Sequence, residues 1–216
     1  MKINILIDKN SWAANHKNYI NNSIKKIFNN AQIYHSAGKI KINSYITIFF
    51  SYFKIVKKSI LLKSKYNLIV HESNLPKGRG MSPISWQILE GKNEIYFSLI
   101  EASEKMDKGN IYYKKKVYIK NNLLFKEIKK IQLTENLKLI LKFLKFIKKN
   151  KKAPKSRLQK GKATYYKKRN PKDSVLNINK NLKSQFNLLR ICDNEKYPLY
   201  FNYRGRRYIL RINANE

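Results

Sequence analysis

The sequence predicts an α/β fold in which helices flank a central sheet, and its first 29 residues show why. Residues 2–8, KINILID, alternate and are rich in isoleucine, which indicates an opening strand that ends at Asp8. Residues 14–29 carry apolar side chains at helical spacing with lysine and asparagine between them, which predicts an amphipathic helix. A strand followed by such a helix is typical of α/β proteins.

The next elements continue the alternation. Short apolar runs at 31–34 and 46–52 predict strands, the second dense in isoleucine and phenylalanine like a strand covered on both faces. Residues 55–63 predict a short helix. Residues 67–71, NLIVH, predict the next strand, which ends at His71.

The second half of the chain predicts longer elements. Pro83 suits the first turn of a helix over 83–89, and residues 94–100 predict a further strand. Residues 123–149 predict a long helix with an apolar stripe and a lysine face. The same stripe suits core packing, our preferred interpretation, or an anionic lipid surface.

The run KKNKKAPK at 148–155 is typical of a segment between structural units. We therefore expect a catalytic domain over 1–149 and a small α+β appendage over 150–216. In the appendage, residues 204–206 predict a hairpin turn.

Composition narrows the class of protein. The chain has 216 residues with one cysteine, Cys192, so it cannot form an internal disulfide, and we expect a cytoplasmic setting. The start MKINILIDKN lacks the features of a signal peptide, and the longest apolar stretch, 45–53, is too short to span a membrane.

The charge balance points to polyanions without identifying one. Lys and Arg total 47 against 13 Asp and Glu, a formal net charge of +34. Solvated surface lysines are our preferred explanation, although such a chain is also expected to bind nucleic acid nonspecifically at low salt. The Tyr and Lys residues at 163–169 keep a nonenzymatic RNA-binding module open as an alternative.

His71 stands where an apolar run stops and a polar loop begins. In open α/β sheets ligands bind beyond the carboxyl ends of the strands, so a histidine here suits function, although it also suits a simple strand end. Gly78 and Gly80 in the following loop fit close approach of a ligand or an ordinary turn.

The run from 71 to 113 resembles the folate-dependent formyltransferases, methionyl-tRNA formyltransferase and more closely the sugar N-formyltransferases. The positions that match the family pattern, in order, are His71, Ser73, Leu75, Pro76, Arg79, Gly80, Pro83, Trp86, Asp107 and Gly109. The resemblance implies a Rossmann-like sheet and transfer of a formyl group from 10-formyltetrahydrofolate to a primary amine, with no metal.

The resemblance also implies roles. His71 takes the proton of the attacking amine, and Asp107 orients the imidazole. Where the family has an asparagine two residues before the histidine, this chain has Ile69, which cannot donate to the developing oxyanion. We expect Asn74 to replace it, ahead of Ser73 or backbone N–H groups. The alternative is a folate-binding relative without the chemistry.

Binding roles follow in the same way. The resemblance places the folate against Ser73, Leu75, Pro76, Gly80, Ala102 and Gly109. Lys77 and Arg79 are expected at the phosphates of the acceptor, or simply in solvent. Trp86 suits ligand stacking, but packing of its helix onto the sheet is the preferred interpretation.

The expected acceptor is a nucleotide-linked amino sugar, as in surface polysaccharide biosynthesis. Methionyl-tRNA formyltransferases normally continue into a larger carboxyl-terminal domain, whereas only about 60 residues follow the predicted linker. Aminoacyl-tRNA remains the alternative acceptor, and the sequence leaves a homodimer open.

Overall fold

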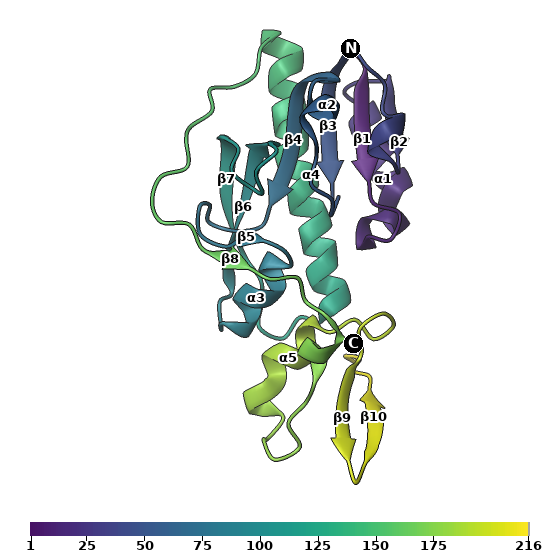
Figure 1. Cartoon of the computed structure of the whole chain (residues 1–216), viewed down its shortest axis with the longest axis vertical. Coiled ribbons are helices and arrows are strands. Elements are labelled where there is room, and N and C mark those ends of the chain that lie inside the picture. Colours follow the sequence, from purple (N-terminus) through teal and green to yellow (C-terminus); the bar gives the residue numbers. More distant parts are fainter. Residues whose placement is uncertain (216) are drawn as a thin grey trace.

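The computed structural model of the chain, which describes residues 1–215, has a six-stranded sheet at its centre (Figure 1). The strand order is β2-β1-β3-β4-β6-β7. The first four strands are parallel, and β6 and β7 are antiparallel to their neighbours. Their bounds are Ile3–Ile7 for β1, Ala31–Tyr34 for β2, Ser44–Phe50 for β3, Ser64–His71 for β4, Glu94–Glu101 for β6 and Ile111–Tyr118 for β7. The predicted α/β fold is confirmed.

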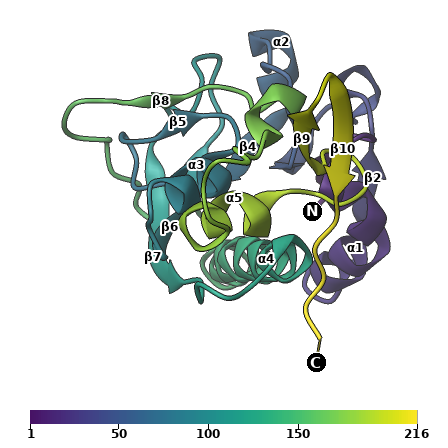
Figure 2. The same cartoon turned by 90° about the horizontal axis from the view of Figure 1, so that it is seen from below.

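The alternation along each strand assigns the two faces of the sheet. Ile5 and Ile7 belong to the large core, which includes apolar residues of α1 (Lys17–Lys25) and α4 (Phe125–Asn150), whereas Leu6 belongs to a smaller cluster on the opposite face, beside α2 (Lys58–Leu61). Figure 2 shows α1 and α4 on one side of the sheet and α2 on the other. The stripe of the long helix is therefore core, as preferred.

The first predicted helix needs correction. Residues 12–16 form a 3-10 helix, Trp12–His16, and α1 ends at Lys25 instead of reaching residue 29. It ends there because the N–H groups of Ile27 and Phe28 both donate to the carbonyl of Ile24, at 3.0 Å each, which closes the last turn tightly.

The segment after α4 returns to the body of the protein. The strand β8 (Tyr165–Tyr166) pairs in parallel with β5 (Arg79–Gly80), in front of α3 (Pro83–Leu89). Beyond it come two 3-10 helices, Pro171–Ser174 and Lys183–Gln185, then α5 (Phe186–Ile191) and the hairpin of β9 (Leu199–Tyr203) and β10 (Arg206–Leu210). The predicted hairpin turn is present, and the domain boundary stays a prediction.

Arg190 of α5 attaches this carboxyl-terminal portion to the segments that precede β6 and follow β7. Its side chain is fully buried, and it donates to the carbonyls of Leu123 and Lys120 and to the side chain of Asn93. Burial lowers the pKa of this guanidinium. The carboxyl-terminal portion is thereby fixed beside α4, below the ends of the parallel strands.

Among residues 1–215, no helix is long and apolar enough to cross a membrane. The same residues hold no cluster of His, Cys, Asp and Glu that could bind a metal ion.

Candidate active site

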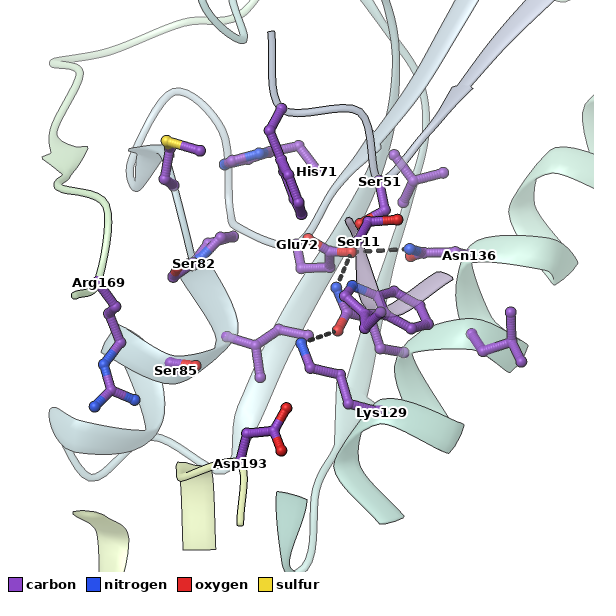
Figure 3. A pocket seen from close by; sticks show the side chains of 18 of the residues that line it. Ser11, Ser51, His71, Glu72, Ser82, Ser85, Lys129, Asn136, Arg169 and Asp193 are labelled. Atoms are coloured by element: carbon purple, nitrogen blue, oxygen red, sulfur yellow. Dashed lines mark hydrogen bonds between the residues drawn. The ribbon is translucent and has the colours of Figure 1, made fainter. Parts of the chain in front are cut away.

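A cavity of about 1510 Å³ opens at the carboxyl ends of β1, β3 and β4. Its walls come from the loop after β1, the segment between β3 and α2, the loop after β6, one side of α4 and the segment around Asp193. Figure 3 shows His71, Glu72, Ser51 and Lys129 in this cavity, together with Asp193. It is the place where an open α/β sheet ordinarily binds its ligand.

His71 and Asp107 meet in this cavity, although 36 positions separate them in the sequence. The imidazole Nδ1 lies 3.5 Å from Asp107 Oδ2, and both side chains are buried. The other ring nitrogen, Nε2, lies 2.7 Å from the carbonyl oxygen of Gly78. A carbonyl only accepts, so Nε2 carries a proton and donates it to Gly78.

This pairing makes Nδ1 the basic nitrogen of His71. Its lone pair lies on the side of Asp107 and Gly80, which both line the cavity, whereas Gly78 does not. A proton taken up on Nδ1 is placed beside the carboxylate, which stabilises the imidazolium. The proton-accepting edge of the imidazole therefore faces the cavity.

Asp107 is held from several directions. Its Oδ2 accepts the N–H of Gly80 at 2.9 Å, and its own carbonyl accepts Gln159 Nε2 at 2.7 Å. The residue itself adopts a left-handed φ of 50°, a backbone conformation that non-glycine residues adopt at a cost. This loop is therefore tightly constrained where it presents the carboxylate.

Gly109 allows the same loop to pass against β6. A Cβ at this position would lie 1.6 Å from the carbonyl oxygen of Glu101. No side chain fits in that gap, so glycine is required here. Gly109 thus supports the position of Asp107 from behind the cavity wall.

The expected folate residues fall into two groups. Gly80 and Ala102 line the cavity. Ser73, Leu75, Pro76 and Gly109 do not: the first three are buried in the loop that supports His71, and Gly109 packs against the backbone of β6. These four residues lie behind the cavity wall and have no surface in the cavity.

The three remaining predicted residues point elsewhere. Asn74 is exposed, and its Oδ1 accepts Lys114 Nζ at 2.7 Å. Lys77 is exposed outside the cavity lining. Arg79 is buried, with its guanidinium on Gln159 Oε1 at 2.6 Å. None of the three lines the cavity, so the structure gives no support to Asn74 as an oxyanion donor or to Lys77 and Arg79 at the acceptor.

Trp86 and the Tyr–Lys segment pack against each other. The Trp86 and Tyr166 rings stack with centroids 6.5 Å apart, and Trp86 Nε1 donates to the carbonyl of Lys167. Tyr166 also donates to Glu90 at 2.8 Å, and burial together with this hydrogen bond raises the pKa of Tyr166. The structure shows Trp86 packed on the returning segment around Tyr166, and not on the six-stranded sheet as the preferred interpretation expects.

The cavity differs in character along its length. Near Asp107 its wall is largely apolar, with Phe49, Val56, Ile69 and Ile100. Near α4 it combines the apolar Phe125 and Leu133 with a cluster of polar side chains. There Glu72 Oε1 accepts Gln132 Nε2 at 2.7 Å and Asn136 Nδ2 at 2.8 Å, and Lys129 Nζ donates to Gln132 Oε1 at 2.8 Å (Figure 3). Burial lowers the pKa of Lys129 to about 8, against the opposing effects of Glu72 and Asp193.

Comparison with known proteins identifies the family. A family model described as formyl transferase matches residues 13–144, more than half of the chain. The chain belongs to the formyl transferase family. The methionyl-tRNA formyltransferase of Buchnera aphidicola (subsp. Schizaphis graminum) is 36% identical over 139 residues, which are 64% of this chain and 44% of that protein.

Solved structures show the same fold. A sugar N-formyltransferase from Shewanella sp. superposes with a TM-score of 0.69 at 15% identity, covering 100% of this chain and 99% of that one. HypX from Aquifex aeolicus in complex with tetrahydrofolic acid gives 0.72 at 14% identity, covering 98% of this chain and 37% of that one. This formyl transferase family member spans about half the length of the curated relatives it matches first.

Four residues of this candidate site were not predicted from the sequence: Ser51, Glu72, Lys129 and Gln159. Glu72 had a detectable signal, because it follows His71 at the end of a strand and must point to the opposite face, toward the long helix. Gln159 had none, since it reaches the loop of Asp107 from a segment 52 residues away.

Proposed function

We propose that this chain transfers the formyl group of 10-formyltetrahydrofolate to the primary amine of a nucleotide-linked amino sugar. The observation that carries the proposal is the His71–Asp107 pair, whose basic edge faces a cavity with one apolar end and one polar end. An N-acyl transfer needs a site of this kind for the amine proton, between a carrier and an acceptor.

The apolar end fits the folate. Phe49, Val56, Ile69 and Ile100 supply flat apolar walls for a pterin ring, and Ala102 leaves room between them. Polar backbone lies beside them, because the loop after β6 also lines the cavity. Ligand pockets ordinarily combine apolar walls with a few such polar groups. The bound carrier supplies the formyl group, and the chain supplies its orientation.

His71 then accepts the proton. An amine that attacks a formyl carbon becomes cationic and must lose a proton before the product is stable. Nδ1 of His71 receives this proton, and Asp107 Oδ2 at 3.5 Å stabilises the resulting imidazolium. The bond between the formyl carbon and the folate nitrogen then breaks, and the imidazolium returns its proton to that nitrogen, so that tetrahydrofolate leaves as a neutral amine. Gly78 keeps the ring fixed during the transfer by accepting from Nε2.

The developing oxyanion needs a donor that Ile69 cannot provide. Ser51 is the candidate that the cavity offers. Phe49 pairs with Ile69 in the parallel register of β3 and β4, so Ser51 follows β3 at the level where His71 ends β4. Its φ of 50° turns the chain at this point, and the residue lines the cavity. Its hydroxyl can donate to an oxygen there.

Two acceptors compete for the polar end. Lys168, Arg169 and Lys196 line the cavity and suit the phosphates of either a nucleotide sugar or a tRNA. The curated relatives named as methionyl-tRNA formyltransferases favour tRNA as the second candidate. The polar wall near Glu72 favours a sugar, which has hydroxyl groups to satisfy it. The proposal retains the expected cytoplasmic setting and a link to polysaccharide biosynthesis.

The test is an acceptor panel with 10-formyltetrahydrofolate. It contains UDP-linked and dTDP-linked hexoses with one amino group at carbon 2, 3 or 4, and methionyl-tRNA. The release of tetrahydrofolate is followed by absorbance and the product by mass. A formylated sugar supports the proposal. Formylation of methionyl-tRNA alone replaces the acceptor, and no transfer to any member of the panel contradicts the proposal.

A further inference from the structure

The polar wall beside His71 contains a buried carboxylate with one unused oxygen. Glu72 is 6% exposed, and both of its hydrogen bonds, from Gln132 and Asn136 on successive turns of α4, go to Oε1. Within residues 1–215, no donor bonds Oε2. A buried charge costs free energy unless it is paired, so an oxygen presented to a cavity in this way indicates a ligand that donates to it.

Strand alternation explains how two consecutive residues serve the cavity differently. Ile69 and His71 lie on the face of β4 toward the loop of Asp107, whereas Val70 and Glu72 lie on the α4 face. The side chain of His71 therefore faces the reacting groups. The side chain of Glu72 faces the part of the cavity that lies between those groups and α4.

Lys129 provides a donor on the same wall. Its Nζ makes one hydrogen bond, to Gln132, and lies 5.2 Å from the centre of the Trp12 ring. In the described part of the chain it forms no ion pair within 4 Å, although Glu72 and Asp193 both act on it electrostatically. An ammonium has three donors, so two remain for a ligand.

Asp193 supplies a second acceptor from the carboxyl-terminal portion. Its Oδ1 accepts the N–H groups of Glu195 at 2.9 Å and Lys196 at 3.3 Å, which fixes the carboxylate. Oδ2 has no hydrogen bond among residues 1–215. In Figure 3 this carboxylate faces the side of the cavity that holds Lys129.

We infer that Glu72, Asp193 and Lys129 form the subsite that binds the hydroxyl groups of the acceptor sugar, an inference that rests on the proposed function. A pyranose hydroxyl both donates and accepts, so neighbouring hydroxyls match two fixed carboxylate oxygens and one ammonium. The indole of Trp12, which also lines the cavity, gives the ring an apolar face to rest on. A thioether side chain would leave all three polar groups unsatisfied.

The test uses Glu72→Gln and Asp193→Asn. Both substitutions keep one oxygen for the internal hydrogen bonds and replace the unused oxygen with an amide nitrogen. Titration calorimetry measures the affinity of the 216-residue chain for the UDP-linked and dTDP-linked amino sugars of the panel and for UDP and dTDP alone. We expect each variant to weaken amino-sugar binding by about 10- to 100-fold and to leave binding of the bare nucleotide within about twofold. Glu195→Gln, an exposed neighbour at the same cavity, is the matched control and should change neither.

The outcomes separate this inference from the proposed function. If the wild type neither binds nor formylates any amino sugar, the proposed function fails. If it does both and the two variants bind the sugar as tightly as Glu195→Gln, the subsite alone is refuted. Thermal unfolding of each variant checks the fold, and Lys129→Met gives a third, independent position at which sugar affinity should fall.

Discussion

Lys129 makes the stability of this protein depend on pH in a direction that can be calculated. Burial lowers the pKa of its ammonium from 10.5 to about 8. At about 1.36 kcal/mol per pH unit, this corresponds to about 3 kcal/mol. The folded state binds fewer protons than the unfolded state between pH 8 and 10.5, so this group's contribution to the free energy of unfolding rises with pH across that window.

The perturbation is Lys129→Met, which keeps the length of the side chain and removes the charge. At pH 7 the variant escapes the burial cost of about 3 kcal/mol but leaves Gln132 Oε1 without its donor, which costs about 1 kcal/mol. We therefore expect it to be about 2 kcal/mol more stable than the wild type. Near pH 10.5 the lysine is largely neutral, the gain disappears, and the variant should be the less stable protein.

Urea unfolding at pH 7, 8, 9 and 10, followed by tryptophan fluorescence, measures this difference. Other groups titrate in the same range, but they are common to both proteins and cancel. Lys130→Met, an exposed neighbour on α4, controls for loss of a positive charge and should show a small, constant difference. A Lys129→Met protein that is less stable at pH 7, with a difference that does not change with pH, would refute the reasoning.

Two further predictions concern the cavity wall. Gly109→Ala should lower the free energy of unfolding, measured in urea, by more than about 2 kcal/mol, because its Cβ would lie 1.6 Å from the carbonyl oxygen of Glu101. Gly38→Ala is the control and should cost far less, since the nearest neighbour of its Cβ would lie at 3.9 Å. Equal urea midpoints for the two variants would argue against the tight loop. Ser51→Ala should reduce kcat for formyl transfer by about 10²- to 10³-fold without weakening tetrahydrofolate binding. Ser85→Ala, at another serine that lines the cavity, is the control and should leave kcat unchanged. An unchanged kcat for Ser51→Ala would exclude its hydroxyl from the mechanism.

Most helices and strands of the fold could be predicted from the sequence. An alternating run located β1 and short apolar runs located β2, β3, β4 and β6 to within a few residues, and Pro83 marked the start of α3 at its observed position. The strand β7 was not anticipated, because Lys114, Lys115 and Lys116 interrupt its apolar pattern. Those lysines are tolerated since β7 is an edge strand with partly exposed side chains.

The site was only partly accessible from sequence. His71 could be placed by its position at a strand end, but its meeting with Asp107 depends on a loop that returns through the fold, and only family resemblance paired them. Asn74 and Arg79 looked suitable by residue type. Their side chains instead bond Lys114 and Gln159, contacts across 40 and 80 positions that no local pattern encodes.

The pair of His71 and Asp107 is the centre of this account, and single-turnover formyl transfer tests it most directly. His71→Ala and Asp107→Asn are mixed with stoichiometric 10-formyltetrahydrofolate and the acceptor amine, while tetrahydrofolate binding is measured separately by calorimetry. We predict that both variants bind the folate as the wild type does and that transfer falls by at least about 10²-fold. Transfer at the wild-type rate by His71→Ala would contradict the account.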